Sequence, residues 1–77
     1  MTFNEHKIEL IYKAENTPEF KKDIALQRVV EILKSIDSIK MLKKEKGLID
    51  RICVDSVENW DTIELILSFT ANYAKVK

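Results

Sequence analysis

Few side chains of this sequence have the types and spacing that chemistry requires. His6 is the single imidazole and stands beside Glu5, with no second histidine, cysteine cluster or carboxylate pair at metal-ligand spacing. Cys53 is the single cysteine and lies between Ile52 and Val54, where a small apolar filler is favoured over a reactive thiolate. One glycine is too few for a glycine-rich phosphate loop. We therefore expect a non-enzymatic protein without metal or cofactor, with His6 in solvent.

A cluster of lysines is the other group of side chains with a chemical use. It contains Lys40, Lys43, Lys44 and Lys46. Such a cluster can contact phosphates, so nucleic-acid binding through a basic turn at Lys40 to Lys46 is the alternative function. The whole chain has thirteen basic and thirteen acidic residues and a formal net charge of zero, which disfavours a polyanionic partner. The acidic stretch from Asp50 to Glu64 instead suits a protein partner or a second copy.

Length and composition indicate one domain that spans residues 1–77. Seventy-seven residues are near the lower limit for a single hydrophobic core, so self-association would help. The lone Cys53 cannot form an intramolecular disulfide, which indicates a reducing compartment, and we expect the cytoplasm. The start has no basic segment followed by an apolar one, and no apolar run is long enough for a bilayer. We expect neither classical secretion nor a membrane partner.

The elements that must position these residues begin with Thr62 to Ala74, TIELILSFTANYA. From Ile63 to Tyr73 every odd position is apolar, and every even position is polar except Ile66. A period of two predicts a strand with one face in a core. A helix with one polar face is the alternative, but the enrichment in Ile, Thr, Phe and Tyr favours the strand. His6 to Glu15 alternates in the same way and predicts a first strand.

One amphipathic helix is predicted between these strands. Thr17 is placed to cap it, and Pro18 falls at the first helical position, where its missing N–H costs nothing. Phe20 and Ile24 lie outside its apolar stripe. That stripe consists of Ala25, Leu26, Val29, Ile32, Leu33 and Ile36.

The end of this helix leaves two possibilities open. Either it continues to Gly47, or it stops near Asp37 and residues 38–43 form a strand, with Gly47 in the hairpin turn, which the pattern favours. Residues 48–55 predict a strand covered on both faces, and residues 56–61 a connection. The predicted fold class is α+β, with a small antiparallel sheet of three or four strands (order β-α-β-β or β-α-β-β-β) and one amphipathic helix packed on one face.

The sheet face turned away from the helix carries the candidate partner-binding residues. With the strands in register, Ile11, Ile49, Cys53 and Ile66 form an apolar strip there. Trp60, in the connection, is either a lid on the edge of the core or an exposed anchor for a partner. A dimer with twofold symmetry needs only one self-complementary patch. We therefore expect a small interaction module that forms a homodimer and binds another protein.

Overall fold

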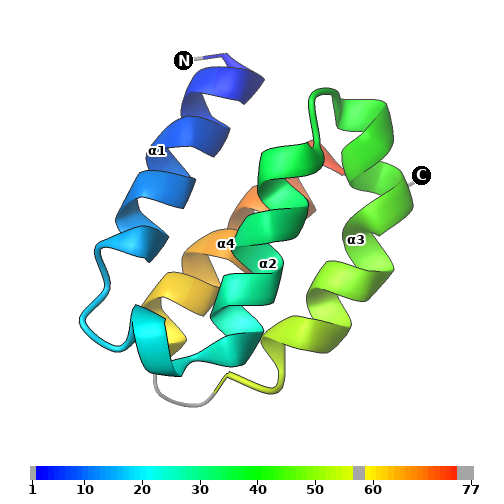
Figure 1. Cartoon of the computed structure of the whole chain (residues 1–77). Helices are drawn as coiled ribbons and strands as arrows, with labels where there is room; N and C mark the ends of the chain where they lie inside the picture. Colours follow the sequence, from blue (N-terminus) through cyan, green and yellow to red (C-terminus); the bar gives the residue numbers. More distant parts are fainter. Residues whose placement is uncertain (1, 57–58, 75–77) are drawn as a thin grey trace.

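The protein is all-helical in the computed structural model, which describes residues 2–56 and 59–74 (Figure 1). No β-strand occurs in these two ranges. The prediction of an α+β fold with an antiparallel sheet is therefore wrong. The elements are α1 (Phe3–Glu15), a short 3-10 helix η1 (Phe20–Lys22), α2 (Ile24–Ser35), α3 (Ile39–Cys53) and α4 (Trp60–Tyr73).

The four α-helices run alternately up and down and close into a bundle (Figure 1). α1 and α3 lie at opposite edges of the bundle, and each of them contacts both α2 and α4. The inner faces form one core, in which the largest fully buried side chain is Phe69. Each of the four helices therefore packs on two neighbours and keeps an outer face exposed.

The segment predicted as the long final strand, residues 62–74, forms most of α4. Its buried side chains recur every three or four residues, as in a helix with one face in the core: Thr62, Ile63, Ile66, Phe69 and Thr70. Ile66, the exception to the alternation, is fully buried, whereas Leu65, which obeys it, is 41% exposed. The strand prediction failed because the preference of β-branched and aromatic residues for strands is weak and tertiary packing overrides it.

The predicted first strand, residues 6–15, is helical as well. Thr2 caps α1, with its hydroxyl accepting the Glu5 N–H at 3.2 Å while the Glu5 carboxylate accepts the Thr2 N–H at 3.3 Å. This reciprocal capping box starts the helix before the alternating segment is reached. Lys7, Leu10 and Ala14 are the buried residues of the helix.

The predicted central helix exists but starts later than expected. Thr17 is not its cap, because the Thr17 hydroxyl donates to the Lys13 carbonyl at 3.1 Å and lies 3.2 Å from the Thr62 hydroxyl. Asp23 caps α2, with its carboxylate accepting the Leu26 N–H at 3.0 Å. The predicted apolar stripe is confirmed: Leu26, Val29, Leu33 and Ile36 are fully buried, and Ala25 and Ile32 are half-buried.

Of the two predicted ends of that helix, the stop near Asp37 is confirmed and the continuation to Gly47 is wrong, as is the strand expected after the stop. α2 ends at Ser35, and Ser38 caps a new helix, α3, by accepting the Met41 N–H at 3.2 Å. α3 replaces both the hairpin at 38–47 and the strand at 48–55, and Gly47 lies inside it without a positive φ. The buried residues of α3 are Leu42, Ile49 and Cys53, which share one helix face.

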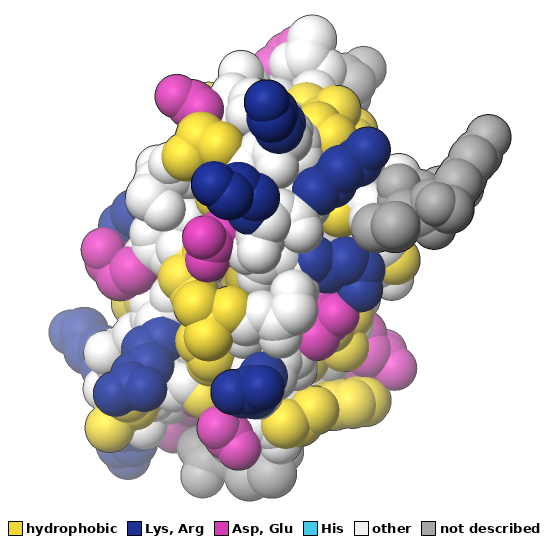
Figure 2. Space-filling model, turned by 90° about the vertical axis from the view of Figure 1, so that its right-hand side faces the viewer, with side chains coloured by type: hydrophobic (Ala, Val, Ile, Leu, Met, Phe, Trp, Pro, Cys, Tyr) yellow, Lys and Arg dark blue, Asp and Glu magenta, His cyan; other side chains and the backbone are white. Residues whose placement is uncertain are grey.

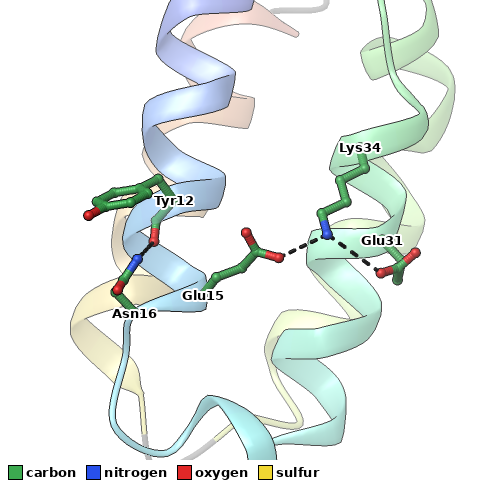
Figure 3. A network of polar contacts seen from close by, with 5 residues as sticks. All are labelled: Tyr12, Glu15, Asn16, Glu31 and Lys34. Atoms are coloured by element: carbon green, nitrogen blue, oxygen red, sulfur yellow. Dashed lines mark hydrogen bonds and ion pairs between the residues drawn. The ribbon is translucent and has the colours of Figure 1, made fainter.

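Polar contacts join the helices at several places. The buried Lys7 ammonium of α1 donates to the Ile36 carbonyl, where a cation also faces the negative end of the α2 dipole. On the surface, Lys34 of α2 donates to the Glu15 carboxylate of α1 at 2.8 Å and lies 4.0 Å from Glu31 (Figure 3). This ion pair raises the pKa of Lys34, and because the pair is exposed it contributes little to stability.

The strongest polar junction is centred on Asp23. Besides capping α2, the Asp23 carboxylate accepts hydrogen bonds from Asn59 Nδ2 at 2.8 Å and from the Ser56 hydroxyl. All three side chains are buried. Asp23 therefore ties the start of α2 to the connection between α3 and α4.

Candidate interaction surfaces

The apolar strip expected on the outside of a sheet does not exist as a surface. Ile49 and Cys53 of α3 and Ile66 of α4 are fully buried, and Ile11 of α1 is half-buried against the core. The strip depended on two-residue periodicity, and a helix places these side chains on inward faces instead. Three of the five predicted partner-binding residues thus pack the core.

The Cys53 thiol fills part of the core, as the sequence suggested. It is fully buried on the inner face of α3. Burial raises the pKa of the thiol to about 12, with the nearby Asp50 carboxylate as a second cause. The thiolate, which is the nucleophilic form, is therefore scarce at neutral pH.

Trp60 agrees with one of the two possibilities left open for it, whereas His6 differs from its prediction. Trp60 begins α4 with its side chain 53% exposed, so it is the exposed residue rather than a lid on the core. His6 is half-buried, with its ring 5.1 Å from that of Phe69 and its Nδ1 3.3 Å from the Tyr73 hydroxyl. Phe3 completes this aromatic cluster between α1 and α4. His6 therefore packs two helices together rather than standing free in water.

The predicted lysine cluster lies on a helix rather than in a turn. Lys40, Lys43 and Lys44 are exposed on the outer side of α3. Lys46 points elsewhere, toward Asp50. Its ammonium group donates a hydrogen bond to the Asp50 carboxylate at 2.6 Å. Three of the four predicted phosphate-contact residues thus share one surface.

A fourth cation, Arg51, joins the three lysines on that surface. At 3.6 residues per turn, an arc of about 100° on the outer side of α3 contains five residues of the helix. They are Lys40, Lys43, Lys44, Gly47 and Arg51, all exposed, and together they are called the cationic face below. Figure 2 looks onto this edge of the bundle and shows Lys and Arg side chains along it, with Asp, Glu and hydrophobic side chains between and beside them.

A second surface is a groove between α2 and α3 that is lined by both apolar and charged side chains. A cavity of about 500 Å³ lies there, with Ile24, Ala25 and Ile52 as its apolar lining and Glu19, Lys22, Asp23, Arg28 and Asp55 as its charged lining. Leu48 and Met41 do not line this cavity, but helical spacing puts them on the same side of α3 as Ile52, and both are exposed. The five apolar residues are called the α2–α3 groove. Exposure is large for aliphatic side chains at Ile24 (66%) and Leu48 (45%).

Sequence reasoning missed this groove, although one signal pointed to it. Ile24 fell outside the predicted stripe of its helix, as did Phe20. The structure places Phe20 in η1, half-buried against the core, and Ile24 at the first position of α2. An apolar residue off the buried stripe of a helix is a candidate for a surface contact.

The described residues offer no group of three or more His, Cys, Asp or Glu side chains that could hold a metal ion. No helix within residues 2–56 and 59–74 has both the length and the apolarity needed to cross a bilayer. Comparisons with protein-family models, with curated proteins and with solved structures found no match.

Proposed function

We propose that the protein is a small non-enzymatic interaction module that forms a homodimer through the α2–α3 groove and binds another protein in that state. The observation that supports this most is the exposure of Ile24 and Leu48 beside the half-buried Ile52. Scattered exposed apolar residues are ordinary, but residues that share one groove indicate a contact site. The proposal includes a cytoplasmic location, which the lone Cys53 supports.

The charges around the groove favour a second copy as the occupant. Lys22 and Arg28 line the cavity together with Glu19, Asp23 and Asp55. In a dimer with twofold symmetry, the same patch of the two copies meets in opposite directions. A cation of one copy can then pair with a carboxylate of the other. The net charge of zero also leaves no overall repulsion between copies.

The size of the interaction is compatible with a dimer. Burial of about 600 Å² of apolar surface corresponds to about 15 kcal/mol before association costs. Those costs are about 4–15 kcal/mol, so the net is roughly 0–11 kcal/mol, a range that includes a dimer of micromolar affinity.

The test is a double substitution that charges the groove without disturbing the fold. Ile24→Asp places a carboxylate at the first turn of α2, where the helix dipole favours it, and Leu48→Glu uses a good helix former at an exposed position. Analytical ultracentrifugation at high micromolar concentration should show a dimer for the wild type and a monomer for the double variant. Melting curves at low protein concentration check that both are folded.

The matched control is Ile8→Glu on α1, where the side chain is 62% exposed and far from the groove. This variant should dimerise like the wild type. A monomeric wild type, or a groove variant that dimerises normally, overturns the proposal. Loss of the dimer in Ile8→Glu moves the interface to α1 and overturns it as well.

A further inference from the structure

The cationic face of α3 takes no part in holding the fold together. None of its four cations, Lys40, Lys43, Lys44 and Arg51, forms an ion pair among residues 2–56 and 59–74. The acidic residues of α3 lie off this face, and one of them, Asp50, already pairs with Lys46. Four like charges on one helix face repel one another. No carboxylate in the described part of the chain pairs with them, so an anion that binds there reduces this repulsion.

Gly47 lies in the middle of this face and has no evident structural reason to be glycine. Its φ is not positive, and a Cβ built on it meets nothing within 4 Å. Glycine inside an exposed helix is unfavourable relative to alanine. Because glycine has no side chain, the helix backbone at Gly47 is not covered, and a partner can approach it closely between the cations.

From these two observations we infer that the cationic face binds the phosphate backbone of duplex DNA. From Lys40 to Arg51 the helix rises about 16 Å, a length over which duplex DNA carries roughly ten negative charges. Lys43 and Lys44 project to opposite sides of Gly47, so the face can reach phosphates on both sides of a bound α-helix. The major groove of B-form DNA is wide enough for an α-helix, whereas that of A-form RNA is narrow.

The composition of the face separates DNA from other polyanions. Protein interfaces and bilayers are anchored by aromatic or apolar side chains, and single strands stack on aromatic rings. None of the four side chains of the cationic face is aromatic or apolar, and Gly47 has no side chain, although exposed apolar residues stand beside the face at Ile39, Leu48 and Val54. The four cations themselves fit a phosphate backbone. The face shares no residue with the α2–α3 groove, although the two surfaces border each other on α3.

Fluorescence anisotropy with a labelled duplex of mixed sequence tests the inference. Binding should be independent of sequence, with a Kd of about 10⁻⁴–10⁻⁶ M near physiological salt. Four phosphate contacts predict a slope of about −3.6 for log K against log salt, or roughly a hundredfold loss between about 50 and 200 mM salt. The variant Lys43→Gln/Lys44→Gln should halve this slope. Lys13→Gln/Lys21→Gln removes the same charge from exposed positions outside α3 and should leave the slope unchanged.

Substitutions at Gly47 test whether DNA approaches the helix backbone closely, which the charge variants do not test. Gly47→Ala and Gly47→Gln should both raise the melting temperature, because the site is open and both residues favour helix. The glutamine side chain should nevertheless weaken DNA binding about tenfold, since it holds phosphates away from the backbone, and alanine should weaken it less. A stabler protein that binds DNA less well distinguishes close approach from damage to the fold.

Three results overturn the inference. One is the absence of binding at low salt, and a second is equal loss of binding in the α3 and control variants. The third is tighter binding to duplex RNA, to vesicles rich in phosphatidylserine or to polyglutamate than to DNA, each of which assigns the face to another partner.

Discussion

Substitution of Asp23 measures how strongly one junction holds the bundle. Asp23→Ala removes the cap of α2, which costs about 1 kcal/mol. It also leaves the buried donors of Ser56 and Asn59 without an acceptor, at about 1–3 kcal/mol each. The expected loss is therefore about 3–7 kcal/mol, out of a total stability of roughly 4–12 kcal/mol for a domain of this size.

Asp23→Asn separates the charge from the cap. Asparagine caps helices as well as aspartate does, but its amide nitrogen cannot accept the Asn59 hydrogen bond. Loss of a hydrogen bond to a charged group predicts a decrease of about 1.5–3 kcal/mol at neutral pH. With about 4–8 °C of melting temperature per kcal/mol, the change is easily measured by circular dichroism.

The pH dependence of stability gives a second readout of the same junction. Burial raises the pKa of Asp23, but hydrogen bonds from Ser56, from Asn59 and from the Leu26 and Ala25 N–H groups outweigh it and lower the pKa below 3.8. In the unfolded chain the pKa of Asp23 is about 3.9, and above that pH the stabilisation by the ionised carboxylate is complete. As the pH falls through the lower pKa of the folded state, the carboxylate is protonated and this stabilisation is lost. Asparagine does not titrate, so the stability of Asp23→Asn should not show this decrease below about pH 4.

Asp37→Asn is the matched control, because Asp37 is exposed in the connection between α2 and α3. The free energy of unfolding is measured with urea for the three variants, from neutral to acidic pH. At neutral pH it should be lower than that of the wild type only for the two Asp23 variants. The reasoning is refuted if Asp23→Asn keeps wild-type stability at neutral pH together with the wild-type response to acid.

Three further predictions concern the core, the thiol and α3. Phe69→Ala should lower the free energy of unfolding by about 3–5 kcal/mol, because the ring is fully buried against Phe3 and Tyr73; a loss below about 1 kcal/mol would show that the aromatic cluster is not formed. Cys53 should resist iodoacetamide at neutral pH in the native protein and react in urea, and rapid native labelling would contradict its burial. Gly47→Ala should stabilise the protein by up to about 1 kcal/mol in urea unfolding; destabilisation would mean that the site is not open.

The parts of the fold that sequence could predict are those with one clear periodicity. The apolar stripe of α2 was predicted almost residue by residue, because Leu26, Val29, Leu33 and Ile36 fit only a helix. α4 could not be decided this way. Its alternation and its residue types favoured a strand, and only the exposure of Leu65 and the burial of Ile66 in the structure show the helical period.

The remaining errors have local causes. The Thr2 and Glu5 capping box is a sequence signal for α1 that outweighs the short alternation after it. For the candidate sites, charge was easier to predict than apolar exposure. Lysines at positions 40, 43 and 44 are exposed in a turn or a helix alike, whereas the outer or inner position of Ile49 depends on which periodicity the chain adopts.

The aromatic cluster between α1 and α4 has a consequence for the order of folding. It joins the two ends of the described chain, with His6 and Tyr73 separated by 67 positions, while α2 and α3 are joined by a three-residue connection. Contacts distant in sequence carry the larger loop-closure entropy. The α2–α3 hairpin should therefore assemble early, and α1, which buries only Lys7, Leu10 and Ala14, should dock last and detach first in native-state hydrogen exchange.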